Sequence, residues 1–121
     1  MDSTNSNAST DGYCGGVSCA VEIGDAIAAV SGRWAIQVLE GIHFSGGASR
    51  FRALQRRIGA ISSKELSRQL GTLVAHGVVE RVAHSPANIS YQLTDSGRGL
   101  MRHMQALGEW ARSMHRLTFP R

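Results

Sequence analysis

Apolar residues recur at helical spacing along most of the chain, in segments separated by glycines. In the first segment, Ile23, Ile27 and Val30 follow one another at steps of four and three. Ser18 precedes this run in the position of a helix cap, and Gly32 follows it. The pattern therefore predicts a first helix that starts at Ser18 and ends at about residue 30.

Two more helices are expected before residue 60. The second begins at about residue 33 and ends at Gly46 and Gly47. Its wide apolar face consists of Trp34, Ala35, Val38, Leu39 and Ile42. The third is short, has Ser49 as its predicted cap, buries Phe51 and Leu54, and closes at Gly59.

The clearest helix start lies at Ser62. The run Ser-Ser-Lys-Glu over residues 62–65 fits a capping box, in which the Glu65 carboxylate reaches back to the amide of Ser62. Three leucines at positions 66, 70 and 73 then share one face, and His76-Gly77 forms a stop signal. A fourth helix is predicted between these limits.

After Gly77 the pattern changes to short strands. Residues 78–82 and 89–93 are predicted to pair as a β-hairpin, with residues 83–88 as a long tip. Thr94 is then expected to cap a final helix. Its seam, at steps of 4, 3, 4 and 3, consists of Leu100, Met104, Leu107, Ala111 and Met114, with Trp110 and Leu117 alongside. The seam is too short for a free coiled coil, so it must pack on this domain or on a partner.

This order of elements predicts a mainly α protein with a small β-hairpin wing, that is, a winged helix-turn-helix. The first 17 residues, rich in Ser, Asn, Thr and Gly, are expected to form a flexible N-terminal tail. Residues 18–121 would form the DNA-binding and dimerisation domain. With 121 residues, the chain has no room for a second catalytic domain.

The charge of the chain favours a polyanionic partner. Thirteen basic residues against nine acidic ones give a formal net charge of +4. Between Arg50 and Arg68 there are six basic residues and one acid, Glu65. All but Lys64 are arginines, whose planar guanidinium can bind phosphate or guanine through two parallel hydrogen bonds.

We expect the fourth helix to enter the major groove of DNA, where its polar side chains reach bases and nearby phosphates. These side chains are Ser62, Ser63, Lys64, Ser67, Arg68 and Thr72. Four arginines of the third helix would contact the DNA backbone: Arg50, Arg52, Arg56 and Arg57. At the hairpin, His84 and Asn88 could reach a flanking minor groove. The alternative for each residue is a solvated polar surface without a ligand.

The sequence offers little support for other classes of function. It has no apolar run long enough to span a membrane and no secretory signal, which suggests a cytoplasmic protein with Cys14 and Cys19 as free thiols. The cysteines and histidines show no metal-binding spacing, and no cofactor motif or hydrolase motif is present. A thiol peroxidase-like activity at Cys19 is the enzyme alternative.

Several short motifs together resemble the HxlR-type transcriptional regulators, a winged helix-turn-helix family allied to the MarR type. The matching segments are residues 19–22, 32–34, 50–54, 61–62, 66–70, 77–81 and 91–97. The resemblance implies a homodimer built from the N- and C-terminal helices on a pseudo-palindromic operator. The two reading helices would lie about one DNA turn, roughly 34 Å, apart. The hairpin tip departs from the family pattern, with Pro86 followed by Ala87 and Asn88.

The resemblance also bears on the regulatory signal, because Cys19 falls where many family members have a cysteine that senses oxidants or electrophiles. A position in the first helical turn would lower the pKa of its thiol, and Cys14 could act as the resolving thiol. Alternatively, Cys19 packs as a small apolar residue and a small molecule binds near Trp34, Met104 and Trp110. A winged helix that binds protein in place of DNA is the remaining alternative.

Overall fold

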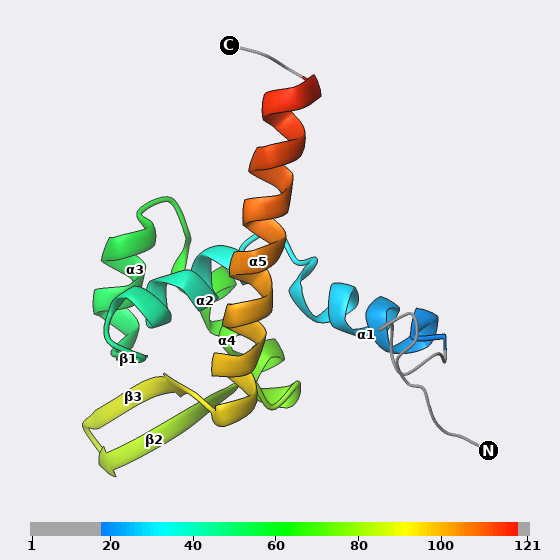
Figure 1. Ribbon diagram of the computed structural model, residues 1–121. Coiled ribbons are helices and arrows are strands. Elements are labelled where there is room, and N and C mark those ends of the chain that lie inside the picture. The colour runs from blue at the N-terminus through cyan, green and yellow to red at the C-terminus, as the bar shows by residue number, and fades with distance from the viewer. Residues whose placement is uncertain (1–17, 119–121) are drawn as a thin grey trace, which may run out of the picture. The chain divides into compact units, whose positions relative to one another are not determined.

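The computed structural model describes residues 18–118, with side chains as far as His115. The chain divides into two compact units, of which the first ends at Ser31 and the second begins at Gly32. The predicted tail, residues 1–17, lies outside the described residues. Within the described residues, the first unit contains one helix and the second contains all the others (Figure 1).

The helix of the first unit, α1 (Ala20–Val30), begins one residue later than a cap at Ser18 implies. Its N-cap is Cys19, and the Ser18 hydroxyl accepts a hydrogen bond from the Ala20 amide at 3.3 Å. None of the α1 residues is buried, and the exposed fraction of Val21 is 72%. The apolar face of α1 is therefore uncovered in this structure.

Three helices build the core of the second unit: α2 (Ala35–Phe44), α3 (Phe51–Ile58) and α4 (Ser63–Ala75). The helix α2 contacts both α3 and α4. Its residues Leu39 and Ile42 are completely buried, as is Leu54 of α3. The leucine face predicted for the fourth helix is confirmed, because Leu66, Leu70 and Leu73 are all buried.

The start of α3 differs from the prediction. Ser49 does not cap it, because this residue belongs to a short strand, β1 (Ala48–Ser49), and its hydroxyl donates to the Arg50 carbonyl. The N-cap is Arg50, whose backbone is extended. The buried Ser49 thus belongs to the sheet and does not cap the helix.

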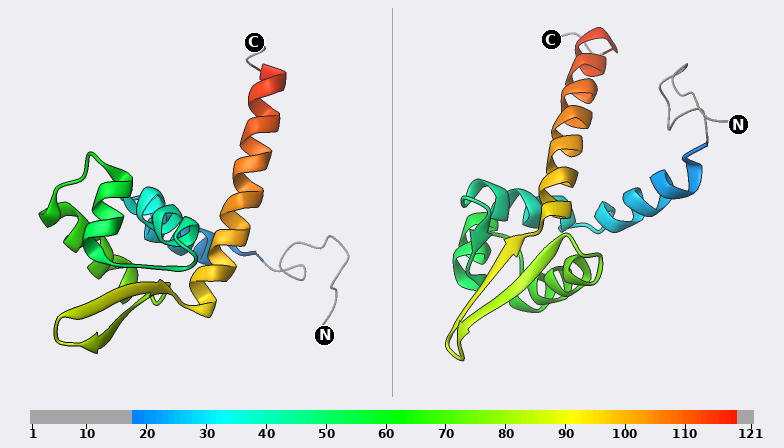
Figure 2. Two further views of the ribbon diagram at one scale, coloured as in Figure 1. Left: turned by 90° about the vertical axis from the view of Figure 1, so that its left-hand side faces the viewer. Right: turned by 60° about the horizontal axis from the view of Figure 1, so that its bottom comes forward.

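The sheet has three antiparallel strands in the order β1-β3-β2. The strands β2 (Val79–Ser85) and β3 (Asn88–Leu93) form the wing, a ribbon whose tip points away from the start of α5 (Figure 2). The predicted long tip is wrong: pairing continues through Ala83 and Ile89, and only residues 86–87 form the turn. A bulge between Ala83 and Ser85 accommodates the extra residue.

The junctions on either side of the wing match the sequence pattern. Gly77 ends the fourth helix with φ at 78°, a left-handed conformation that glycine adopts without strain. The last helix is α5 (Asp95–Thr118), and the predicted cap is confirmed. The Thr94 hydroxyl accepts from the Gly97 amide at 3.0 Å and donates to the Gly77 carbonyl at 2.7 Å. This threonine fastens the start of α5 to the end of α4.

Only the first turns of α5 pack on the rest of the second unit. Met101 is buried, whereas Leu107 and Trp110 are 64% and 60% exposed. The remainder of the helix extends clear of the other helices of its unit and of the sheet (Figures 1 and 2). The Leu117 side chain lies outside the described residues. Of the predicted seam, Leu107 and Met114 are therefore exposed within one chain, whereas Leu100, Met104 and Ala111 are half-buried. No helix in residues 18–118 combines the length and apolar character that crossing a bilayer requires.

Candidate nucleic-acid interface

The start of α4 is capped as predicted on one side only. The Ser62 hydroxyl accepts a hydrogen bond from the Glu65 amide at 3.1 Å, so the serine cap is confirmed. The Glu65 carboxylate does not complete the predicted capping box. It accepts from Arg68 at 2.5 Å and from Gln69 at 3.4 Å. The carboxylate thus accepts hydrogen bonds from side chains further along the helix and not from the cap amide.

The two faces of α4 differ sharply in chemistry. The buried face contains the three leucines and Gln69, whereas Lys64, Ser67, Arg68 and Thr72 are all exposed. The Thr72 hydroxyl donates to the Arg68 carbonyl at 3.1 Å. The structure therefore brings the predicted base-reading side chains together on one solvent-facing surface. We call Lys64, Ser67, Arg68 and Thr72 the polar face of α4.

Arg68 and Glu65 form an ion pair within this surface. Their side chains are 68% and 26% exposed, and the Arg68 Nη2 atom lies 2.5 Å from the Glu65 carboxylate. The hydrogen bond from Arg68 is the main cause of the lowered pKa of Glu65, desolvation opposes it, and Gln69 and Arg33 add to the lowering. The same pair raises the pKa of Arg68. Both groups are therefore charged at neutral pH.

A glutamine joins α3 to the start of α4. The Gln55 amide donates to the Ser63 hydroxyl at 3.1 Å and to the Ile61 carbonyl at 3.3 Å. Sequence reasoning assigned no role to Gln55, since a lone glutamine between arginines carries no motif. Its contact engages Ser63, a predicted DNA contact and the first residue of α4.

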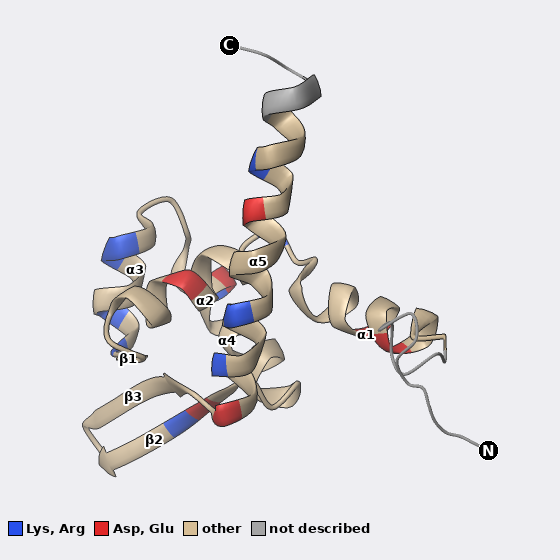
Figure 3. Cartoon of the chain, in the orientation of Figure 1, with Lys and Arg blue, Asp and Glu red and all other residues tan. Residues whose placement is uncertain are grey.

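The four arginines expected to contact the DNA backbone lie on α3 and just before it. All four are exposed: Arg50, Arg52, Arg56 and Arg57. The described residues of α3 include no acid, and Figure 3 shows its basic positions gathered on this helix. The helix therefore adds a positively charged surface next to the turn that leads into α4.

The two wing residues lie in strands and not in a loop. His84 belongs to β2, is exposed, and its Nε2 atom lies 3.3 Å from the Ser90 hydroxyl. Asn88 begins β3 opposite Ser85 and is half-buried. The hydrogen bond to Ser90 holds the imidazole against the wing.

The cysteine expectation needs a correction. Cys19 is disulfide-bonded in this structure, so the free thiol predicted there is wrong. Its position also differs, since Cys19 is the N-cap of α1 and not part of its first turn. Cys14, the other cysteine of the sequence, lies outside the described residues. A disulfide at Cys19 is compatible with a thiol that takes part in oxidation.

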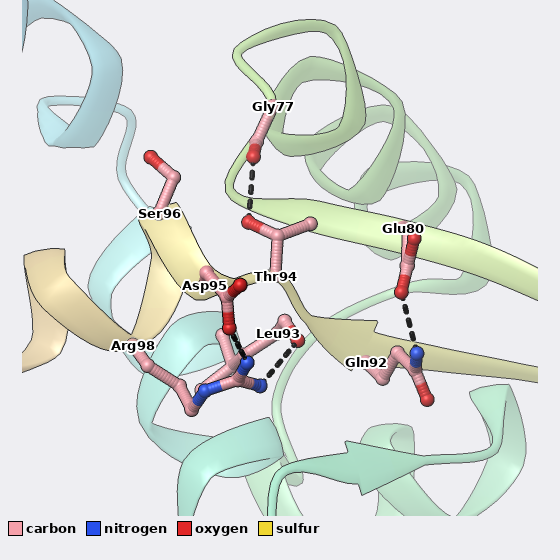
Figure 4. A pocket seen from close by; sticks show the side chains of 8 residues that line it. All are labelled: Gly77, Glu80, Gln92, Leu93, Thr94, Asp95, Ser96 and Arg98. Atoms are coloured by element: carbon pink, nitrogen blue, oxygen red, sulfur yellow. Dashed lines mark hydrogen bonds and ion pairs between the residues drawn. The ribbon is translucent and has the colours of Figure 1, made fainter.

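A pocket of about 410 Å³ lies where the wing meets α5 (Figure 4). Its polar side chains are bonded to their neighbours: Glu80 accepts from Gln92 at 2.5 Å, and Arg98 binds both Asp95 and the Leu93 carbonyl. The residues expected to line a ligand site are not part of this pocket: Trp34 is half-buried beneath the Arg33 guanidinium, Met104 is half-buried, and Trp110 is exposed. Among the described residues, no three metal-ligating side chains are grouped to hold an ion.

The sequence model of the HxlR-like helix-turn-helix family matches residues 29–118, three quarters of the chain. The chain belongs to the HxlR-like helix-turn-helix family. Among its relatives is YtfH of Escherichia coli, an uncharacterized HTH-type transcriptional regulator, which is 32% identical over 83 residues. That match covers 67% of this chain and 64% of YtfH, so the chain spans just under two thirds of this relative.

Solved structures of similar regulators have the same winged-helix fold as this HxlR-like chain. The quinone-bound form of YodB from Bacillus subtilis superposes with a TM-score of 0.67 at 26% identity, covering 77% of this chain and 98% of YodB. The redox regulator HypR in its oxidized form gives a TM-score of 0.61 at 32% identity, covering 78% of this chain and 96% of HypR. The mainly α fold with a small β wing is therefore confirmed.

Proposed function

We propose that this HxlR-like chain is a sequence-specific DNA-binding transcriptional regulator that binds a pseudo-palindromic operator as a homodimer. The observation that carries the proposal is the polar face of α4, which is exposed along a helix whose opposite face is buried. A helix of this kind fits the major groove, and its arginine can read guanine through two hydrogen bonds. Residues 18–121 would provide both DNA binding and dimerisation.

The proposal divides the contacts between α3, α4 and the wing. Ser62 and Ser63 at the N-terminus of α4 would bind a phosphate, and the polar face would reach bases. The four exposed arginines of α3 and its N-cap would neutralise the phosphate backbone. His84 and Asn88 would approach the neighbouring minor groove. No catalytic activity and no cofactor form part of this proposal.

Dimerisation would use the apolar faces that the single chain leaves uncovered. In α5 these include Leu107 and Trp110, and in α1 they include Val21, Ile23 and Ile27. Large exposed apolar patches on a small protein usually mark an interface. A symmetric dimer would place one α4 in each half-site of the operator.

We further propose that oxidation or electrophile modification of Cys19 controls DNA binding, with Cys14 as the resolving thiol. Two similar proteins, quinone-bound YodB and oxidized HypR, support a switch of this kind. In the reaction, two thiols form one disulfide and pass two electrons and two protons to an oxidant such as diamide. The second candidate is control by a small molecule bound near Trp34, Met104 and Trp110.

The DNA-binding proposal is tested by selecting duplexes from a random-sequence pool with the reduced full chain. Affinities for the enriched duplex and for a random duplex are then measured by fluorescence anisotropy. Arg68→Ala should reduce the binding free energy for the enriched duplex by about 1 to 3 kcal/mol, through the loss of recognition at one base pair. Arg56→Ala should weaken both duplexes alike and reduce the salt slope by about one. A wild-type chain that enriches no sequence would contradict the proposal, and a winged helix that binds protein in place of DNA would then be the favoured explanation.

The switch is tested on the same enriched duplex after treatment with diamide or a quinone. Oxidant should change the affinity of the wild-type chain and leave Cys19→Ser unaffected, because the serine cannot form a disulfide. Cys14→Ser separates the two thiols: it should still react with a quinone at Cys19 but not form the disulfide. Equal responses of wild type and Cys19→Ser would exclude the thiol switch and favour the small-molecule alternative.

A further inference from the structure

A chain of contacts runs along the inner edge of the polar face of α4. The Glu65 carboxylate receives hydrogen bonds from Arg68 Nη2 at 2.5 Å and from Gln69 Nε2 at 3.4 Å. Gln69 is only 8% exposed, so this side of the carboxylate is held by a buried group. The Ser62 cap does not depend on the Glu65 carboxylate, because the cap bond uses the Glu65 amide.

Gln69 is itself held by the residue that precedes α2. A Cβ atom built on Gly32 would lie 3.0 Å from Gln69 Nε2 and 3.1 Å from Gln69 Oε1. The Gln69 side chain therefore packs directly on the Gly32 backbone, and a methyl group there would have to displace the Gln69 amide by a few tenths of an ångström. The next residue, Arg33, adds a favourable charge to the carboxylate of Glu65. The Gly-Arg-Trp run at residues 32–34 thus acquires a role that its sequence did not suggest.

A free arginine side chain pays a large entropic cost when it is fixed for base recognition, on the order of 2 kcal/mol. The bond to Glu65 restricts the Arg68 guanidinium before any DNA is present. It engages one of the five N–H groups of the guanidinium, so enough donors remain for a two-bond contact with guanine. An arginine held in this way is prepared for one geometry and therefore for one base.

We propose that Glu65 is a specificity-determining residue: its carboxylate positions the Arg68 guanidinium for one base pair, and Gln69, packed on Gly32, holds that carboxylate in place. This inference rests on the proposed DNA-binding function and deepens it. Glu65 itself touches no base in this arrangement and acts through Arg68.

The experiment compares base discrimination among variants of the full reduced chain. Duplexes are selected from a random pool with the wild type, and anisotropy then measures the enriched duplex and its single-base-pair changes. Glu65→Gln should reduce discrimination at one base pair about tenfold and leave the other positions unchanged. Arg68→Ala should abolish discrimination at the same base pair. The double variant should lose no more discrimination there than Arg68→Ala alone.

Two further variants separate positioning from charge and from folding. Glu40→Gln removes the same charge from an exposed site on α2 and should leave discrimination unchanged. Gly32→Ala alters no charge, but it should push Gln69 and reduce discrimination about threefold at the base pair that depends on Arg68. Thermal unfolding of each variant confirms that it is folded before its affinity is compared.

Each other outcome overturns a definite part of the inference. If Glu65→Gln changes the affinity for all duplexes by one common factor, Glu65 acts only through its charge. If Gly32→Ala leaves the Arg68-dependent base pair unchanged, Gln69 does not hold the carboxylate. If the wild type enriches no sequence, the proposed function fails first and the inference fails with it.

Discussion

The junction between the wing and α5 depends on a single residue without a side chain. A Cβ atom at Gly97 would lie 2.0 Å from the Val78 carbonyl oxygen, far inside van der Waals contact. That oxygen cannot easily move, because it accepts a hydrogen bond from the Thr94 amide at 3.1 Å. Overpacking of this kind typically costs about 1 to 3 kcal/mol. We therefore expect Gly97→Ala to destabilise the fold by that amount.

Gly99→Ala provides the matched control two residues along the same helix. A Cβ atom there would meet only Arg102 Nη2 at 3.6 Å, an ordinary contact. Replacing a helical glycine by alanine without a clash should stabilise the helix by about 0.5 to 1 kcal/mol. The two alanine variants should thus shift stability in opposite directions, although their composition is identical.

Thermal unfolding followed by circular dichroism measures both shifts. For about 100 residues, 1 kcal/mol corresponds to a change in Tm on the order of 5 °C. Gly97→Ala should therefore melt roughly 5 to 15 °C below the wild type, and Gly99→Ala a few degrees above it. Protein concentration must be equal in all samples, since a dimer melts at a concentration-dependent temperature. A Gly97→Ala chain as stable as Gly99→Ala would refute the close packing at Val78.

Two predictions concern association and ionisation. Leu107 and Phe44 are both 64% exposed, but only Leu107 lies in the α5 seam. Leu107→Ser should weaken the proposed dimer by roughly 3 kcal/mol over two copies, about a hundredfold in Kd, whereas Phe44→Ser should leave the Kd unchanged. Sedimentation equilibrium measures both dissociation constants. Equal effects of the two substitutions would exclude the seam as the interface. For the ion pair, an NMR titration should place the pKa of Glu65 below its ordinary value. The contribution of the pair to folding stability should be present at neutral pH and should be lost as the pH falls through that lowered pKa. Arg68→Gln should raise the pKa of Glu65, and an unchanged value would show that Arg68 is not the cause.

Much of the helical framework could be predicted from the sequence, because the signals that begin and end these helices are local. Ser62, Gly77 and Thr94 act on atoms within a few residues, and each does in the structure what its type suggests. Two capping predictions failed because a competing contact was distant or unrecognised. Ser49 is taken by a strand that pairs with β3, and the Glu65 carboxylate by Arg68.

The wing was harder to predict than the helices. Strand β1 has two residues and follows two glycines, so no alternation of polar and apolar residues could reveal it. The length of the hairpin was underestimated, since Ala83 to Ser85 are small or polar and pair mainly through backbone atoms. Backbone pairing leaves little trace in the pattern of side chains. The exposed polar face of α4, in contrast, followed directly from the spacing of its leucines.

The same periodic signal has different meanings in α4 and α5, and only the structure separates them. Leucines at positions 66, 70 and 73 are covered by the chain's own core, whereas Leu107 and Trp110, on an equally regular helix, are not. Periodicity shows which face of a helix is apolar, but not what covers it. Because helices in proteins are stabilised mainly by packing of their apolar face, the exposed apolar residues in the outer part of α5 are suited to a partner surface. In the dimer that we propose, a second copy of the chain would supply that surface with the same seam, and it would also bring the second α4 that a two-fold symmetric operator requires.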